Sequence, residues 1–276
     1  ELTRMMVGRD VLFDFPPVVK APGGVRMRLE ALSARNDKGV EALKEFSLEL
    51  HAGEIVGLAG VDGNGQKELC EVLTGLRPSS GGRILLDDQD ISGRDPAFYI
   101  EQHISHIPED RHTTGLAMNW SLKNNLILKQ LGREPVSRHH LVQKKVVEEI
   151  WDKAHSEYQI KAISGDDLAR ALSGGNQQKV ILAREINSDP RVLIANQPTR
   201  GLDVGAAEYV RTKILEARNS GTSCLLVSAD MEELLQLSDR IAVIYGGQLM
   251  GILPRGADPM AIGRLMMGKR EQEVGA

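Results

Sequence analysis

The residues EIVGLAGVDGNGQKEL, at positions 54–69, predict a strand, a glycine-rich loop and a helix in succession. The first half is a continuous apolar run that predicts a buried strand, and the residues from Gln66 onward predict a helix with one apolar face. Between the two stand Gly60, Gly63 and Gly65. A phosphate-binding loop requires this context, because glycines let successive backbone N–H groups converge on phosphate oxygens and the helix start adds partial positive charge.

The loop departs from the usual phosphate-loop pattern, G-x-x-x-x-G-K-S/T. Gln66 stands where that pattern places lysine, and Lys67 stands where it places a hydroxyl residue. Taken alone, such a run is explained more simply as a turn between a strand and a helix. As a phosphate loop, its candidate nucleotide contacts are Gly60, Val61, Asp62, Gly63, Asn64, Gly65, Gln66, Lys67 and Glu68.

The bulk composition suits a soluble α/β protein. The chain has 276 residues, of which 41% are hydrophobic and 26% charged, with a formal net charge of −4. This balance argues against a polyanion-binding surface, so we expect no nucleic-acid partner. Cys70 and Cys224 lack C-x-x-C spacing, and we expect them to be buried and reduced. No apolar run approaches the roughly 18 residues of a membrane span.

Short apolar runs alternate with helical patterns along the chain. The expected strands are 27–34, 43–50, 54–60, 82–88, 105–110, 191–196, 222–229 and 240–253. Helices are expected at 66–76, 121–131 and 140–158, with no convincing strand between the last two. We therefore expect an α/β core, residues 25–112 and 173–268, with a helical subdomain inserted at 113–172.

The two ends of the chain carry similar segments. RMMVGR at residues 4–9 echoes RLMMGK at 264–269, which suggests that residues 1–24 are the tail of a preceding, similar domain and a linker. The stretch DFPPVVKAPGG at 14–24 has the proline and glycine content of a linker. We expect residues 269–276 to be a disordered tail.

Two further motifs identify a family. LSGGNQQKV at 172–180 and VLIANQPTRGLD at 192–203 follow the glycine loop in the order found in ATP-binding-cassette (ABC) ATPases, and the chain resembles these proteins over residues 27–268. The resemblance implies an α/β fold of the P-loop NTPase, ABC-ATPase type. Such a fold has a mixed sheet, an inserted all-helical subdomain and an antiparallel β part.

Finer matches narrow the resemblance. PEDR at 108–111, LSGGNQQK and PTRGLDVGA are similar to the ATPases of simple-sugar and nucleoside importers, and GNGQKE is most similar to the second cassette of the nucleoside branch. Those ATPases carry two cassettes in tandem on one polypeptide. The resemblance implies a homologous preceding cassette, membrane-spanning permease subunits, an extracytoplasmic solute-binding protein and a position at the cytoplasmic face of the membrane.

Several positions depart from the family pattern. Gln66 carries no charge, and one unit charge about 4 Å from phosphate is worth about 4 kcal/mol at an effective dielectric constant near 20. Lys67 cannot ligate Mg²⁺; its ammonium either folds back onto the loop or is exposed on the helix. Asn196 and Gln197 replace an Asp-Glu pair, and Ala229 replaces a histidine that touches the γ-phosphate.

Two further departures concern metal sensing and adenine binding. Glu109 stands where many cassettes have a glutamine that senses metal and water; here we expect it to form the hinge to the helical insertion. No aromatic residue occurs between residues 16 and 45, where the family places its adenine platform. The chain's own loop is therefore expected to bind ATP weakly, without Mg²⁺, and to hydrolyse it poorly or not at all.

The signature motif is intact, in contrast to the loop. Its residues are Leu172, Ser173, Gly174, Gly175, Asn176, Gln177 and Gln178. In the family, each ATP lies between one cassette's loop and the opposing signature. We therefore expect this chain to complete a partner cassette's Mg²⁺-ATP site, with Asp203 at the interface between them. The alternatives are a non-transport ABC ATPase of translation or repair, and a structural cassette that binds no nucleotide.

Other conspicuous residues have simpler interpretations. Trp120 and Trp151 are explained by helix packing or by contact with a permease. His139 and His140 lie near the expected start of a polar helix, without an identifiable third ligand. We expect no metal site there.

Overall fold

The structure, a computed structural model, describes residues 21–269. The echoed segment 4–9, most of the expected linker and nearly all of the expected tail lie outside the described residues. Contacts group the described chain into two units. The helical unit contains residues 107–189 and 198–213, and the core unit contains residues 21–106, 190–197 and 214–269. The structure thus groups residues 173–189 with the helical insertion, whereas the sequence placed them in the core.

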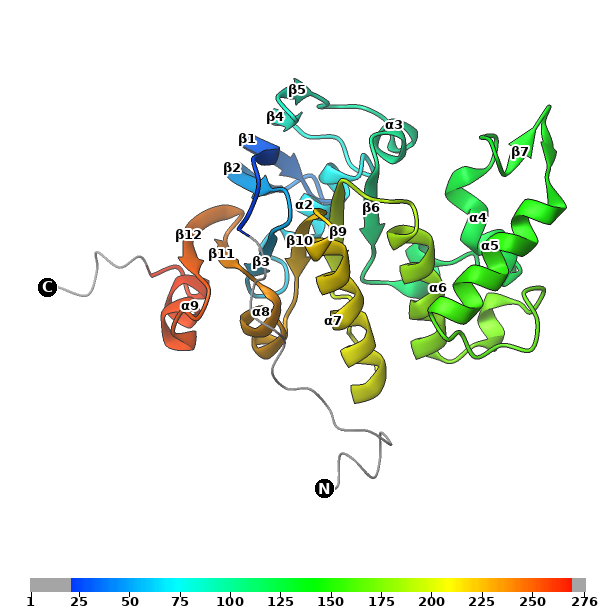
Figure 1. The fold of residues 1–276 in the computed structure, drawn as a ribbon. Helices are drawn as coiled ribbons and strands as arrows, with labels where there is room; N and C mark the ends of the chain where they lie inside the picture. Colours follow the sequence, from blue (N-terminus) through cyan, green and yellow to red (C-terminus); the bar gives the residue numbers. More distant parts are fainter. Residues whose placement is uncertain (1–20, 270–276) are drawn as a thin grey trace, which may run out of the picture. The chain divides into compact units, whose positions relative to one another are not determined.

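The core unit contains two sheets (Figure 1). One is antiparallel, in the order β2-β1-β4-β5, and its strands are β1 (Val25–Arg35), β2 (Glu41–His51), β4 (Gly81–Leu86) and β5 (Gln89–Asp90). The other has the order β12-β11-β3-β10-β9-β6, and its strands are β3 (Ile55–Ala59), β6 (Ile104–Ile107), β9 (Val192–Asn196), β10 (Ser223–Val227), β11 (Arg240–Tyr245) and β12 (Gln248–Pro254). Because β3 is parallel to both its neighbours while β12 is antiparallel to β11, this larger sheet is mixed, as the sequence predicted.

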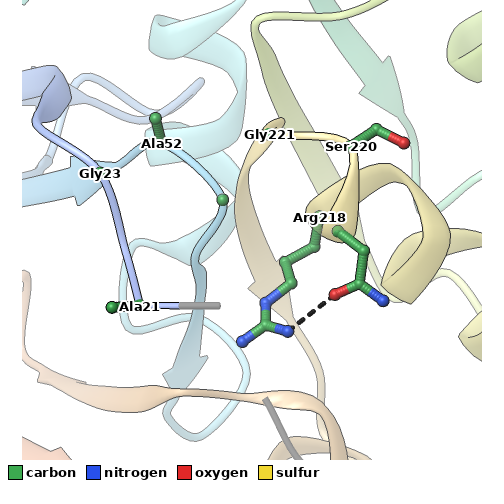
Figure 2. Close-up of a pocket in the computed structure, with 8 residues that line it drawn as sticks. Ala21, Gly23, Ala52, Arg218, Ser220 and Gly221 are labelled. Carbon is green, nitrogen blue, oxygen red and sulfur yellow. Dashed lines mark hydrogen bonds between the residues drawn. The ribbon is translucent and has the colours of Figure 1, made fainter. Parts of the chain in front are cut away.

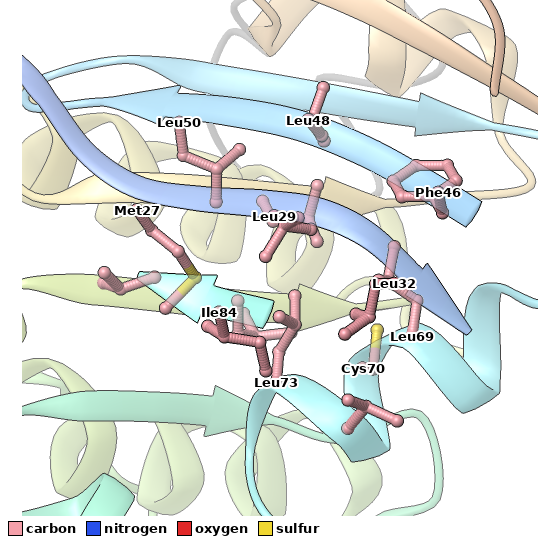
Figure 3. Packing of buried hydrophobic residues seen from close by; sticks show 14 of the residues in the cluster. Met27, Leu29, Leu32, Phe46, Leu48, Leu50, Leu69, Cys70, Leu73 and Ile84 are labelled. Carbon is pink, nitrogen blue, oxygen red and sulfur yellow. The ribbon is translucent and has the colours of Figure 1, made fainter. Parts of the chain in front are cut away.

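Helix α2 (Gln66–Leu73) contacts strands of both sheets. Figure 3 shows Leu69, Cys70 and Leu73 of this helix beside residues of β1 and β4. Every residue of β3 is buried, which explains why its sequence is continuously apolar instead of alternating. The other helices that lie wholly within the core unit are α3 (Pro96–Glu101), α8 (Met231–Leu237) and α9 (Pro259–Met266).

The helical unit holds most of the insertion. Its helical segments are the π-helix η1 (Arg111–Gly115), α4 (Leu122–Ile127), the short 3-10 helices η2 (Leu128–Gln130) and η3 (Ala169–Ala171), α5 (Lys144–Glu157) and α6 (Gly174–Ile186). Helix α7 (Val204–Asn219) begins in this unit and ends in the core unit.

The expectation of a strand-free insertion was wrong. A hairpin pairs β7 (Ser137–Arg138) with β8 (Leu141–Val142), and α5 begins only at Lys144 instead of at residue 140. His139 and His140 form the turn, with left-handed φ angles of 50° and 63°. They therefore lie outside any helix. The apolar spacing of the segment was compatible with a helix and did not reveal this chain reversal.

A buried charge cluster lies in the helical unit. Glu185 of α6 is fully buried, with its carboxylate 2.5 Å from Lys129 Nζ and 2.8 Å from Arg184 Nε. Burial opposes its charge, but Lys129 and Arg184 together lower the pKa of Glu185 to about 2. Trp151 is also buried, with its ring 5.0 Å from that of His155, whereas Trp120 is 46% exposed.

Cys70 and Cys224 are both buried and free of disulfides. Burial raises the pKa of each thiol to about 12, so neither forms a thiolate at neutral pH. Within residues 21–269, no helix combines the length and apolar character that a membrane crossing requires.

Candidate functional site

The glycine loop joins the end of β3 to the start of α2 and is closely packed. Gly63 and Gly65 have φ angles of +87° and +104°, a conformation that glycine adopts most readily. A Cβ atom on Gly65 would lie 2.4 Å from the carbonyl oxygen of Ala42, so no larger residue fits. A Cβ atom on Gly60 would lie 2.6 Å from Gln66 Nε2. The loop glycines are therefore required by geometry.

Hydrogen bonds hold the loop in one conformation. The carbonyl oxygen of Val61 accepts from Asn64 N at 3.2 Å, from Asn64 Nδ2 at 2.8 Å and from Gln66 Nε2 at 3.1 Å. Asn64 also fastens the loop to the turn after β11. Its Oδ1 accepts from Gly246 N at 2.7 Å, and its carbonyl accepts from Gly247 N at 3.1 Å. The loop is thus preformed.

Gln66 and Lys67, the two residues that depart from the phosphate-loop pattern, have different environments. Gln66 is only 8% exposed, and its amide is turned back onto the loop. Lys67 points away from the loop, with its Nζ 3.6 Å from Asp37 Oδ2 and 3.7 Å from Glu71 Oε1. Of the two alternatives for Lys67, the structure shows the exposed helix lysine, with 57% of its side chain accessible. Arg77 donates to Asp37 as well and lowers the pKa of that carboxyl.

The loop fits an anionic phosphate better than it fits a metal ion. Within the described chain, the main-chain N–H groups of Gly63, Gly65 and Gln66 have no protein acceptor, and they precede or begin α2. Such groups suit phosphate oxygens. By contrast, neither Lys67 nor Asn196 offers the carboxylate or hydroxyl oxygen that Mg²⁺ prefers. Residues 21–269 contain no cluster of three or more His, Cys, Asp or Glu side chains placed to hold a metal.

Asn196 is the last residue of β9 and Gln197 follows it, at the same sheet edge as the loop. β10 pairs in parallel with both β3 and β9, so the carboxyl ends of these strands lie at one edge. Asn196 is buried, and Gln197 adopts a left-handed φ of 50°. The Oε1 of Gln197 accepts a hydrogen bond from the main-chain N–H of Ala229 at 3.1 Å. This hydrogen bond therefore links two of the positions that depart from the expected motif pattern.

In the helical unit, the signature motif begins α6. Ser173 is extended and precedes the helix, and its Oγ accepts from Asn176 Nδ2 at 2.9 Å. Asn176 Oδ1 in turn accepts from the main-chain N–H of Lys161 at 2.8 Å. A Cβ atom on Gly175 would lie 3.2 Å from Ala206 Cβ, so this glycine permits close approach to α7.

The two glutamines of the signature fix the chain around it. Gln177 Nε2 donates to the carbonyl oxygens of Ala169 and Leu172, both at 3.2 Å. Gln178 is almost fully buried and donates from Nε2 to the carbonyl oxygen of Pro198 at 2.8 Å. These side chains therefore serve the conformation of the motif.

The hinge and interface candidates also lie in the helical unit. Asp203 Oδ1 accepts from Ala206 N at 2.8 Å and so caps the start of α7. Glu109 forms an ion pair with Arg200. Arg111 and Arg200 were not predicted as site residues, although they stand inside the motifs PEDR and PTRGLD. The Nη1 of Arg111 donates to the carbonyl oxygen of Arg200 at 2.7 Å.

A separate cavity of about 160 Å³ lies in the core unit (Figure 2). It is lined by Ala21, Gly23, Ala52, Gly53, Arg218, Asn219, Ser220 and Gly221. The guanidinium of Arg218 is already bonded to Asp239 at 2.7 Å and to Asn219 at 2.8 Å. Because no predicted site residue lines this cavity, we assign it no ligand.

The structure thus forms two clusters. The loop cluster of the core unit contains residues 60–68, Asn196, Gln197 and Ala229. The signature cluster of the helical unit contains residues 172–178, Glu109 and Asp203.

Comparisons with known proteins identify relatives of the chain. The family model described as ABC transporter matches residues 43–200. The guanosine import ATP-binding protein NupO of Bacillus subtilis is 42% identical, covering 100% of this chain and 54% of the relative. The nucleoside import ATP-binding protein NupA of Lactococcus lactis is 39% identical, and the match covers 97% of this chain and 53% of that relative. A glucose import ATP-binding protein of Haloferax volcanii is 42% identical, and the match covers 97% of this chain and 49% of that relative.

The chain spans about half the length of the curated relatives it matches.

Solved structures agree on the fold. A nucleotide-free cassette from an ABC transporter aligns with a TM-score of 0.73 at 20% identity, covering 92% of this chain and 100% of that one. A dimeric cassette bound to ADP and Pi aligns with a TM-score of 0.72 at 18% identity, covering 84% and 100%. The expected α/β fold of the P-loop, ABC-ATPase type is confirmed.

Proposed function

The chain belongs to the ABC transporter family, and we propose that it is a nucleotide-binding cassette of an importer for a nucleoside or a simple sugar. Three relatives that are 39–42% identical support this substrate class, since they are named for the import of guanosine, nucleosides and glucose. The same relatives favour transport over a role in translation or repair.

The cassette's own loop holds ATP weakly, independently of Mg²⁺, and does not hydrolyse it. The arrangement of Gln66 and Lys67 carries this proposal. A neutral amide, committed to Val61, stands where a lysine would neutralise phosphate, and the neighbouring ammonium is paired with carboxylates away from the loop. Asn196 and Gln197 supply amides in place of the acidic groups that would orient a metal and polarise water.

The signature cluster serves the active site of a partner cassette. Ser173 Oγ and the main-chain N–H groups of Gly174 and Gly175 contact the γ-phosphate of the nucleotide held there, aided by the partial positive charge at the start of α6. When bound at that site, Mg²⁺ supplies further charge neutralisation. Asp203 lies at the interface between the cassettes.

The partners follow from this arrangement. The opposing cassette is a homologous one in tandem on the full-length chain, consistent with relatives about twice as long. Residues 1–24 would then be its tail and the linker. Permease subunits contact the region from Glu109 to Leu131 at the cytoplasmic face of the membrane, and an extracytoplasmic solute-binding protein delivers the solute.

Matched substitutions in the full-length ATPase with its permease test this proposal. Ser173→Ala should lower ATP turnover by about ten-fold, the equivalent of one lost hydrogen bond to a charged group. Gln197→Ala should leave turnover within about two-fold, because this position does no chemistry. A silent Ser173→Ala combined with an inactivating Gln197→Ala would show that the chain's own loop is the working site.

A further inference from the structure

Residues 109–115, here called the strap, are fixed at their first end to Arg200. The carboxylate of Glu109 pairs with the guanidinium of Arg200. Two residues later, Arg111 Nη1 donates to the main-chain carbonyl oxygen of Arg200 at 2.7 Å. Arg200 is thus held through both its side chain and its backbone by neighbouring residues of one segment.

The Arg111 guanidinium also reaches the start of the signature helix. Its Nη2 lies 3.7 Å from the position of a Cβ atom on Gly174 and 3.5 Å from that on Gly201. Gly201 has a left-handed φ of +68°. The guanidinium therefore lies against the first residue of α6 and against the turn that leads to Asp203.

The rest of the strap follows one face of α6. A ring nitrogen of His112 lies 3.1 Å from Gln177 Oε1, and a Cβ atom on Gly115 would lie 2.8 Å from Ile181 Cδ1. At the end of the strap, the carbonyl oxygen of Gly115 accepts from Arg184 Nη2 at 2.9 Å. Residues 177, 181 and 184 share one face of a helix, so the strap and α6 are in contact along most of the helix.

The strap is also braced internally. Asp110 Oδ1 accepts from the main-chain N–H groups of His112 and Thr113 at 2.8 and 3.2 Å, and its Oδ2 accepts from Thr113 Oγ1 at 2.6 Å. The Thr113 hydroxyl and these amides lower the pKa of Asp110, so the brace is present at neutral pH. A braced segment can pass a displacement from one end to the other.

We infer that Glu109, Arg111 and Arg200 form a latch that positions the signature motif. The latch holds the strap, the turn 199–203 and the start of α6 together. The latch is closed when the Glu109–Arg200 ion pair and the Arg111–Arg200 hydrogen bond are formed. Only then do Ser173 and Gly174 face the nucleotide of the opposing cassette. In this inference Glu109 and Arg200 act on the nucleotide only through the signature motif, which makes them positioning residues. The inference rests on the proposed signature role and adds the residues that control it.

Exposure argues against a purely stabilising role. The side chains of Glu109 and Arg200 are 35% and 60% exposed, and exposed ion pairs contribute little to stability. The geometry that the pair imposes, a fixed spacing between two motifs 91 positions apart, is its main consequence. Latch variants should therefore fold normally and fail in turnover.

The test uses the full-length ATPase with its permease in liposomes. Glu109→Gln and Arg200→Gln should each lower kcat for ATP by about ten-fold, with KM within about two-fold, because nucleotide affinity does not depend on the latch. The double exchange Glu109→Arg with Arg200→Glu restores the ion pair and should recover most of kcat. Lys153→Gln removes an exposed cation from α5 and should leave kcat unchanged.

Hydrogen exchange of the same variants measures the latch without reference to activity. Arg200→Gln should accelerate exchange of the amides of residues 109–115 and 173–177, while the melting temperature stays within about 2 °C of the parent. Unchanged exchange, or unchanged kcat in both single variants, would overturn the inference. So would failure of the double exchange to restore kcat.

Ser173→Ala in the same preparation separates the two proposals. If Ser173→Ala lowers kcat and Arg200→Gln does not, the signature role stands and the latch is wrong. If Ser173→Ala is silent, the proposed function fails and the latch fails with it, even where exchange shows that the latch is closed.

Discussion

The side-chain amide of Gln66 donates a hydrogen bond to the carbonyl oxygen of Val61, 3.1 Å away within the same loop. A phosphate-binding loop normally directs a lysine from this position toward its nucleotide. Here the residue supports the loop's own backbone and is largely buried. The glycine cradle is thus kept in shape by the residue that has replaced its principal charge.

Restoring that charge should restore affinity. Gln66→Lys should tighten ATP binding by about ten- to a hundred-fold, which corresponds to about 1.4–2.8 kcal/mol of binding free energy. This gain is smaller than the roughly 4 kcal/mol of an undiminished charge interaction, because desolvation of the lysine offsets part of it. Calorimetric titration of the purified chain measures the change. Gln89→Lys introduces the same charge on exposed strand β5 and should leave affinity unchanged. Equal affinities for the parent and Gln66→Lys would mean that phosphate does not reach this loop.

The packing around Gly60 gives a stability prediction. Gly60→Ala would place Cβ 2.7 Å from Ile244 Cγ2 and 2.9 Å from the Ile244 carbonyl oxygen. The carbonyl oxygen belongs to the backbone and cannot easily move away. We expect a loss of about 1–3 kcal/mol in unfolding free energy by urea denaturation. Gly24→Ala is the matched control, because no atom lies within 4 Å of its added Cβ. A silent Gly60→Ala would show that the loop is loosely packed.

Glu185 makes stability depend on pH in acid. Its pKa of about 2 in the folded chain lies below the ordinary value of 4.5, so the unfolded chain binds more protons between these values. The stabilisation is therefore complete above about pH 4.5 and is lost as pH falls through about 2. Glu185→Gln should remove this part of the acid dependence.

At neutral pH the same substitution should cost about 3–5 kcal/mol, because Lys129 and Arg184 remain buried or half-buried without their counter-charge. Chemical denaturation across pH 2.5 to 7 checks both effects. Glu149→Gln, on an exposed part of α5, should change neither the unfolding free energy at neutral pH nor its dependence on pH. An acid dependence that survives Glu185→Gln would place its origin in other carboxyls.

Local sequence encoded much of the core unit and the start of the signature helix in the helical unit. The run before Gly60 is apolar because β3 is buried on both faces, and the glycine spacing reflects left-handed angles at Gly63 and Gly65. The signature motif likewise begins a helix at Gly174. In each case the residues that specify the structure are neighbours in the chain, so a pattern can reveal them.

Contacts between distant residues were beyond such patterns. Lys67 turns toward Asp37, which lies in the turn between β1 and β2, and no local pattern distinguished this from a lysine folded onto the loop. The pairing of Glu109 with Arg200 spans 91 positions and was not predicted. The turn at His139 and His140 escaped notice because its flanking apolar residues fit a helix equally well.

Equilibrium binding of ATP to the purified chain, with and without Mg²⁺, is the most direct test of whether this loop is a metal-independent clamp. We predict weak binding with the same affinity in the presence and absence of Mg²⁺, and no release of phosphate over hours. Tight, Mg²⁺-dependent binding with turnover would contradict the roles assigned to Gln66, Asn196 and Gln197. No binding at millimolar ATP would leave the signature motif as the chain's sole contribution to catalysis and would contradict the clamp.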